Sequence, residues 1–177
     1  DGFLASLAVE RGENAACVIL SGTGSDGTQG LRAIKEYGGL ALAQEAAEYD
    51  GMMRSAVATG LVDFVMPAEE MPKKLFHYFG HLRETAQRKD GDGVRREVAH
   101  HLPAICALLR GRTGHDFSEY KDSTIIRRIQ RRMQVLQRET PEAYLERLKA
   151  EPREVDLLFN DLLIGVTSFF RDPQSFE

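Results

Sequence analysis

Hydrophobic residues in the first 82 positions follow helical and strand-like spacing in turn. Apolar residues at helical intervals occupy positions 3–8 and 31–34, and continuous apolar runs occupy positions 17–20 and 40–43. Short continuous runs of this kind are typical of strands that are buried on both faces of a parallel sheet. The order helix, strand, helix, strand predicts parallel strands joined by a right-handed crossover.

Further along the chain, the pattern predicts a helix near residues 52–59, a short strand at 62–66 and a helix at about 69–82. Residues 1–82 are therefore expected to form an α/β region, part of a doubly wound parallel sheet. Because we expect the sheet to be incomplete, we also expect an exposed strand edge and poor solubility for this region alone.

From residue 98 to residue 177 the apolar spacing is helical, which predicts an all-α helical region. The first expected helix contains Ile105, Leu108 and Leu109, and the second spans 122–138. A third begins after Thr140-Pro141, and a fourth spans 154–163. A threonine followed by proline is a good helix start, since the hydroxyl caps the helix and proline fits its first position.

Between these regions, residues 83–97 are rich in charged side chains, contain glycine and have few apolar side chains. This is the composition of a linker. The sequence therefore predicts three parts, namely an α/β domain at 1–82, a linker at 83–97 and a helical domain at 98–177.

The chain has 177 residues, of which 42% are hydrophobic and 28% charged, as in a soluble globular protein. The net charge of -4 argues against general nucleic-acid binding. No apolar run reaches the roughly 20 residues that a membrane helix needs, so no membrane insertion is expected. Cys17 and Cys106 are expected to be reduced thiols of a cytoplasmic protein. Since residue 1 is not methionine and lies within a helical pattern, we expect a segment of a longer protein.

The first candidate site is the loop Gly22-Thr23-Gly24-Ser25-Asp26-Gly27, which follows a predicted strand and precedes a predicted helix. In open α/β sheets this position faces the ligand crevice. Ser25 or Asp26 could cap the helix, backbone N–H groups could bind a phosphate, or Asp26 could orient the histidine of a hydrolase triad. The spacing is not that of a P-loop, and a carboxylate would repel phosphate, which disfavours the second interpretation.

Five histidines occur in the sequence, and none of them fits as the base beside Asp26. His77 and His81 stand four residues apart on a predicted helix, but the intervening glutamate of a metalloprotease motif is missing. A solvated helix face explains the pair better, so no metal site is predicted.

The second candidate site is the helix expected at residues 122–138, which is apolar on one face. Its other face carries Arg127, Arg128, Arg131, Arg132 and Arg138. No acidic residue stands at i±4 within this helix to relieve their repulsion. The face is either a solvated surface or a binding surface for something acidic. An acidic protein helix fits better than nucleic acid, since no aromatic stacking residues accompany the arginines.

The third candidate site is the run Thr167-Ser168-Phe169-Phe170-Arg171-Asp172. Adjacent phenylalanines most often belong to a core, and Arg171 could pair with a surface acid. Alternatively, Arg171 could bind the carboxylate of a small molecule bidentately while Thr167 supplies a hydroxyl.

Several motifs in fixed order make residues 1–82 resemble the second half of the CheB-type protein-glutamate methylesterase domain. They occupy positions 1–8, 19–27, 43–44 and 49–52. The resemblance implies that Asp26 is the aspartate of a Ser-His-Asp triad. It also implies that the nucleophilic serine and the histidine belong to an earlier part of the domain, before residue 1.

Residues 100–177 resemble the N-terminal helical domain of CheR-type protein-glutamate methyltransferases. The matching elements are at 113–117, 120–121, 127–133, Tyr144, Leu148 and 167–171. The resemblance implies that Arg127, Arg128 and Arg131 dock the chemoreceptor helix that carries the target glutamate. It further implies that Thr167 and Arg171 contact the methyl donor, S-adenosylmethionine, and that the donor-binding domain would follow residue 177.

Together, the resemblances imply a cytoplasmic chemotaxis protein that hydrolyses glutamate methyl esters on chemoreceptors and methylates the same class of glutamate. We expect these 177 residues alone to catalyse neither reaction, because each site would be incomplete. The alternative is a non-enzymatic scaffold or sensor-kinase segment with degenerate catalytic halves.

Overall fold

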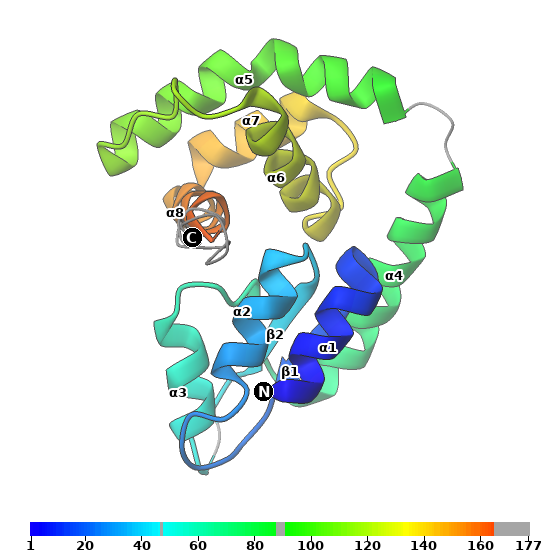
Figure 1. Cartoon of the computed structure of the whole chain (residues 1–177), viewed down its shortest axis with the longest axis vertical. Coiled ribbons are helices and arrows are strands. Elements are labelled where there is room, and N and C mark those ends of the chain that lie inside the picture. Colours follow the sequence, from blue (N-terminus) through cyan, green and yellow to red (C-terminus); the bar gives the residue numbers. More distant parts are fainter. Residues whose placement is uncertain (47, 88–90, 165–177) are drawn as a thin grey trace, which may run out of the picture.

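The computed structural model describes residues 1–46, 48–87 and 91–164, which form two halves packed against each other (Figure 1). The first half, called the α/β half, extends to residue 87, and the second, called the helical half, begins at residue 91. The predicted order, an α/β region followed by an all-α region, is confirmed. Among the residues that the structure describes, no helix is long and apolar enough to cross a membrane.

The α/β half contains three parallel strands in the order β1-β2-β3. Its elements are α1 (Gly2–Arg11), the 3-10 turn η1 (Gly12–Asn14), β1 (Ala16–Ile19), α2 (Thr28–Glu36), β2 (Leu40–Gln44), α3 (Gly51–Ala58), β3 (Phe64–Met66), the 3-10 turn η2 (Ala68–Glu70) and α4 (Met71–Gln87). Ala16 pairs with Leu40, and Leu42 pairs with Phe64. Parallel neighbours need crossover connections, and α2 and α3 provide them.

The central strand, β2, is buried on both faces of the sheet. Ala41 and Ala43 pack in one hydrophobic cluster with residues of α1, α2 and α3. The alternate residues, Leu40 and Leu42, pack in another cluster with Tyr78 of α4. Helices therefore cover both faces, which is the doubly wound arrangement that the continuous apolar run predicts.

Within residues 91–164, the helical half contains four helices. They are α5 (Gly91–Thr113), α6 (Asp122–Val135), α7 (Pro141–Ala150) and α8 (Pro152–Leu163). The hydroxyl of Thr140 accepts a hydrogen bond from the backbone N–H of Ala143 at 3.2 Å, so the predicted cap of α7 is confirmed. The helix expected to reach residue 138 ends at Val135, because Gln137 adopts a left-handed backbone conformation with φ of 54°.

Most of the expected linker, residues 83–97, is helical in the structure. α4 continues to Gln87 and α5 begins at Gly91, so only residues 88–90 lie outside the described helices. Residues 83–87 contain neither glycine nor proline, and they continue the helix that begins with apolar residues. Val98 is buried in the core of the helical half and holds the start of α5. The charged composition reflects solvent exposure of these helix ends.

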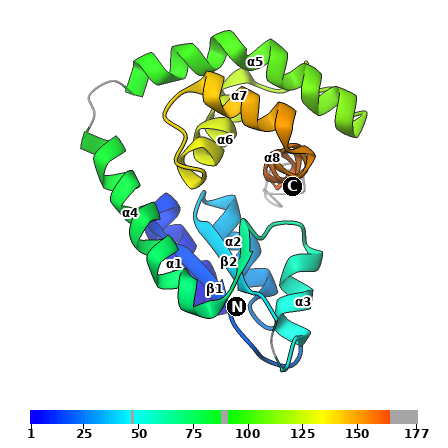
Figure 2. The same cartoon turned by 180° about the vertical axis from the view of Figure 1, so that it is seen from behind.

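The hydrophobic cores of the two halves meet at two points. Val135, the last residue of α6, joins the cluster formed by β2 and α4. Ile164, directly after α8, joins the cluster on the other face of the sheet. Seen from behind, α6 and α8 are the helices whose ends lie next to the α/β half (Figure 2). The two halves are therefore packed together and are not separate bodies on a tether.

Candidate functional site

Asp26 lies at the carboxyl edge of the sheet, in the loop between β1 and α2. Its side chain is 77% exposed and accepts a hydrogen bond from the backbone N–H of Gly27 at 2.9 Å. This hydrogen bond lowers the pKa of the Asp26 carboxyl, so the group is ionised at neutral pH. The side chain is not the cap of α2, since Gly27 is the N-cap residue and the carboxylate of Asp1 accepts from the N–H of Gly30 at 2.8 Å.

The loop after β1 is held against the loop after β2. The N–H of Gly22 donates to the carbonyl of Tyr49, and the N–H of Met52 donates to the carbonyl of Gly22, each at 2.9 Å. A Cβ added to Gly22 would lie 2.3 Å from the sulfur of Met52, and one added to Gly51 would lie 2.9 Å from the backbone nitrogen of Gly24. Gly51 therefore allows a close approach of the two loop backbones at the edge where α/β sheets bind ligands, and Gly22 leaves room for the side chain of Met52.

Asp26, which is expected to be the acid of a triad, has no base beside it among the described residues. Among their hydrogen bonds, none joins Asp26 to a histidine. His77 and His81 lie on α4, which covers the opposite face of the sheet from α2. The described residues also contain no group of three or more His, Cys, Asp or Glu side chains that could hold a metal ion. An exposed, ionised carboxylate in a rigid loop can orient a histidine that approaches from outside.

α6 has the two faces that the sequence predicts, but its arginines do not all face solvent. Ile125 and Ile129 lie in the core of the helical half. Arg128 and Arg131 are each 5% exposed, and Arg132 is fully buried. For these three residues the interpretation as a solvated surface is wrong. Their partners come from distant parts of the chain, which local spacing within the helix could not show.

Arg128 binds the carboxyl end of α2, and Arg131 binds the turn directly after it. The guanidinium group of Arg128 donates to the carbonyls of Lys35 and Glu36 at 3.1 Å each. Nε of Arg131 donates to the carbonyl of Gly38 at 3.0 Å. The last carbonyls of a helix lack partners within it and carry partial negative charge, which favours a cation. Arg128 of the helical half therefore caps α2, and Arg131 binds the turn that follows it.

Asp63, just before β3, is the centre of a buried ion cluster between the halves. One of its oxygens lies 2.6 Å from Nζ of Lys35 and also contacts Arg132, and the other lies 2.8 Å from Arg131. Lys35 also binds Asp161 of α8 at 2.8 Å. Burial alone would raise the pKa of Asp63, but the charges of Arg131, Lys35 and Arg132 outweigh burial and hold that pKa well below its ordinary value.

Glu154 of α8 completes the cluster inside the helical half. Arg132 binds its two carboxylate oxygens at 2.7 and 2.6 Å, and the hydroxyl of Tyr144 donates to it at 3.0 Å. Sequence reasoning missed these acidic partners. A signal was present, since Glu154 and Asp161 share a face of α8 with buried Leu158, and acids at core positions require partners.

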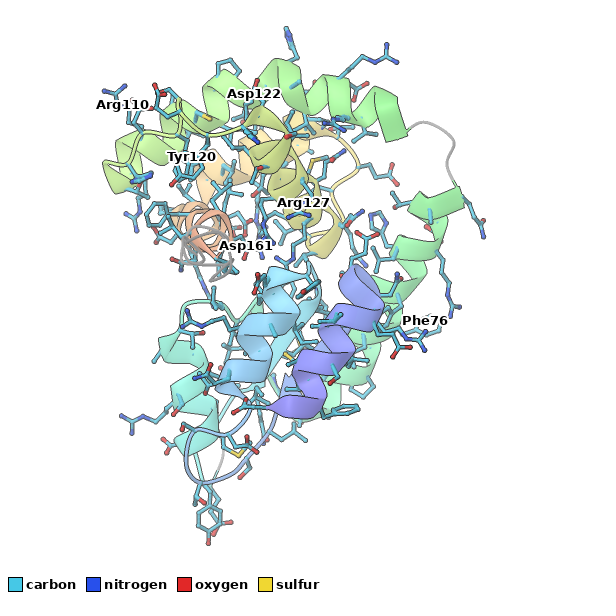
Figure 3. All side chains as sticks on the ribbon, in the orientation of Figure 1. Phe76, Arg110, Tyr120, Asp122, Arg127 and Asp161 are labelled. Atoms are coloured by element: carbon cyan, nitrogen blue, oxygen red, sulfur yellow. The ribbon has the colours of Figure 1, made fainter. Side chains whose placement is uncertain are left out.

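A cleft of about 470 Å³ opens beside the ion cluster, between α6 and the α/β half. Arg127, Gln134 and Arg138 line it from the side of α6, and Glu13 and Tyr37 line it from the side of the α/β half. Figure 3 shows Arg127 on the side of α6 nearest the α/β half. Within the described part of the chain, Arg127 has no salt bridge, so its guanidinium group is available to a partner.

The predicted sites lie at opposite ends of α2 (Figure 1). Asp26 precedes its amino end, Arg128 binds its carboxyl end, and Arg131 binds the turn directly after it. Thr167 and Arg171, which are expected to contact S-adenosylmethionine, lie outside the residues that the structure describes.

Comparison with known families divides the chain at the same place. Residues 1–75 match the CheB methylesterase family, and residues 100–163 match the all-alpha domain of CheR methyltransferases. The two matches together support a fragment of the CheB/CheR fusion type, in which a segment similar to CheB methylesterases precedes one similar to the all-alpha domain of CheR methyltransferases.

Individual relatives agree with this division. A protein of Rhodobacter capsulatus, named "Uncharacterized 104.1 kDa protein in hypE 3'region", is 40% identical over 200 residues, which cover 99% of this chain and 21% of the relative. The protein-glutamate methylesterase/protein-glutamine glutaminase of Moorella thermoacetica is 47% identical over 73 residues, 40% of this chain and 17% of the relative. The protein of that name from Thiobacillus denitrificans is 38% identical over 90 residues, 50% of this chain and 25% of the relative. The chain spans about a fifth of the length of these relatives.

Proposed function

We propose that the protein carrying this chain is a cytoplasmic chemotaxis protein with two opposing activities on chemoreceptors. Its methylesterase part, residues 1–82, belongs to a domain that hydrolyses glutamate methyl esters. Its methyltransferase part, residues 98–177, belongs to one that methylates glutamates of the same class with S-adenosylmethionine. The observation that carries the proposal is the tandem match of the two families on one chain.

In the esterase reaction, a serine attacks the ester carbonyl, methanol leaves, and water then releases the glutamate carboxylate from the acyl-enzyme. Asp26 fixes the tautomer of the histidine that takes the proton of the serine, and stabilises its charged form. The ionised state of Asp26 and the rigid loop that carries it support this role. The serine and the histidine come from other parts of the protein, so these 177 residues alone release no methanol.

In the transferase reaction, Arg127, Arg128 and Arg131 dock an acidic chemoreceptor helix and so position its glutamate against the methyl group. Guanidinium groups suit this role because they bind carboxylates bidentately. The oxygen partners that Arg128 and Arg131 bind in this structure support the assignment. Thr167 and Arg171 contact S-adenosylmethionine, which supplies the electrophilic methyl group.

Methanol release from a methylated chemoreceptor tests the esterase role. The 177-residue chain should release none, and a longer natural chain that carries it should turn over. In that longer chain, Asp26→Asn should lower kcat by about 10⁴-fold, since the histidine loses its orienting charge. Turnover that is insensitive to Asp26→Asn would remove Asp26 from the site. No turnover by the longer chain would favour the non-enzymatic scaffold.

A further inference from the structure

The face of α6 that is proposed to dock a receptor helix is already occupied by the α/β half. The guanidinium group of Arg128 donates hydrogen bonds to the carbonyls of residues 35 and 36. That of Arg131 donates to the carbonyls of residues 38 and 39 and to the carboxylate of Asp63. Both side chains are only 5% exposed. Both residues line the cleft, but their N–H groups are already bonded to these oxygens, so a carboxylate of another protein must displace the α/β half to bind them fully.

The groups that occupy this face have the chemistry of an acidic helix. The carboxyl end of α2 carries partial negative charge, and the carboxylate of Asp63 lies beside it with a full charge. Carbonyl and carboxylate oxygens accept hydrogen bonds from the same guanidinium N–H groups. The end of α2 and Asp63 thus fill the place that an acidic partner would take on Arg128 and Arg131.

The contact between the halves has the composition of one that can open. Its central groups are charged side chains and backbone carbonyls, which are hydrated again when the halves separate. This hydration offsets much of the attraction between them, so they contribute little net free energy to keeping the halves packed. Val135 and Ile164 of the helical half each join a core cluster of the α/β half. The core cluster of the helical half consists of its own residues, and the cluster shared by α1, α2 and α3 takes only Ile164 from the helical half.

We propose that the α/β half inhibits receptor docking by the helical half. The contact of the α2 end and Asp63 with α6 must open before an acidic receptor helix binds Arg128 and Arg131. This regulation rests on the proposed docking function of α6. The receptor helix and the α/β half compete for the same surface of α6. Each therefore weakens the binding of the other to that surface by the same factor. Arg127, on the accessible side of the cleft, provides the first point of attachment.

The test combines peptide binding with amide hydrogen exchange on the full 177-residue chain. The probe is a synthetic helical peptide with glutamates on one face. We expect bound peptide to increase exchange at residues 38–41 and 60–63, which belong to the α/β side of the contact. Asp63→Asn should raise peptide affinity at least about fivefold, the lower end of typical couplings between sites. The asparagine oxygen can still accept from the N–H of Ala41, which lies 2.9 Å from Asp63.

A second variant covers the case in which Asp63→Asn fails to fold. Asn160→Ala removes a donor from α8 to the carbonyl of Gly60, 3.1 Å away across the contact, without changing any charge. It should raise peptide affinity in the same direction. Glu154→Gln is the matched control, because it also removes a buried carboxylate but its partners, Arg132 and Tyr144, belong to its own half. It should give no gain in affinity.

The outcomes separate the inhibition from the docking function. The inhibition would be overturned, and docking left intact, by a peptide that binds without increasing hydrogen exchange in the α/β half. The same peptide would have to bind wild type, Asp63→Asn and Asn160→Ala with equal affinity. Failure of the peptide to bind wild type and both variants would overturn docking itself, and the inhibition with it. Binding to the variants alone would support a strongly closed contact.

Discussion

The candidate site residues at the two ends of α2 differ in how far the fold buries them. At the amino end, Asp26 stands 77% exposed in a loop fixed by backbone hydrogen bonds and close glycine contacts. At the carboxyl end, Arg128 and Arg131 are almost completely buried and bind backbone and carboxylate oxygens. The exposed acid contributes little to the fold, which leaves it free for the role proposed for it in the reaction. The buried arginines hold the two halves together, so any binding role requires that contact to change.

This difference shows that a function is harder to assign to a charged helix face than to a loop at the end of a strand. A charged stripe on a helix is compatible with solvent, with a partner protein or with another part of the same chain. The partner of Arg128 stands 93 residues away in the sequence. A chemical group in a loop at a strand end has fewer alternatives, because topology places that edge at the ligand crevice.

Among changes at the two ends of α2, Arg131→Ala is expected to have the largest effect on the free energy of unfolding. The change leaves Asp63 and Asp161 without one of their buried cationic partners, and loss of one partner of a buried ion pair costs about 3–5 kcal/mol in the free energy of unfolding. Urea denaturation followed by circular dichroism measures it. Arg127→Ala, on the same helix but exposed, should change this free energy by less than about 0.5 kcal/mol. Equal effects of the two changes would contradict the buried contact.

A smaller effect is expected at the rigid loop. Gly51→Ala forces a Cβ against the backbone of Gly24, and overpacking of this kind costs about 1–3 kcal/mol. The matched control is Gly80→Ala on α4, where no atom lies within 4 Å of the new Cβ. There, removal of a helical glycine should stabilise the protein by up to about 1 kcal/mol. Thermal unfolding of both variants would reveal a flexible loop if Gly51→Ala were neutral.

Loss of a single cross-contact hydrogen bond should be smaller still. Asn160→Ala removes the donor to the carbonyl of Gly60 and is expected to cost about 1 kcal/mol in the free energy of unfolding. Asn14→Ala, at an exposed position in η1, serves as the control and should be neutral. The comparison of the two denaturation midpoints shows whether α8 and the α/β half are joined in solution as they are in the structure.

The smallest effect is expected from Asp26→Asn. The carboxylate is exposed and bonded to an adjacent N–H, so the denaturation midpoint should not change measurably. A clear loss of stability would show that Asp26 supports the fold, and its proposed role in the reaction would lose its structural argument.

Much of the fold follows from local patterns in the sequence. Continuous apolar runs predicted β1 and β2, and the 3.6-residue repeat predicted the buried face of α6, because both depend only on neighbouring residues. The composition of 83–97 did not reveal that most of this segment is helical, since charged residues are also good helix formers and α4 and α5 use them at their ends.

The sites divide in the same way. The motif around Asp26 predicted its place at the carboxyl edge of the sheet, because a strand followed by a glycine loop and a helix has one common geometry. The burial of Arg131 could not be predicted, since it depends on Asp63 and Asp161, which approach only through tertiary packing. An aspartate such as Asp63 beside apolar Val62 and Phe64 signals a buried partner without identifying it.

A double-mutant cycle between Arg131 and Asp63 tests the central claim, that α6 is held by the α/β half, most directly. The free energy of unfolding would be measured for wild type, Arg131→Met, Asp63→Asn and the double variant. Contact between the two groups at 2.8 Å predicts a coupling free energy of about 1.5–3 kcal/mol, as expected for hydrogen bonds between charged groups. A coupling near zero would mean that the two groups do not meet in solution and would contradict the account.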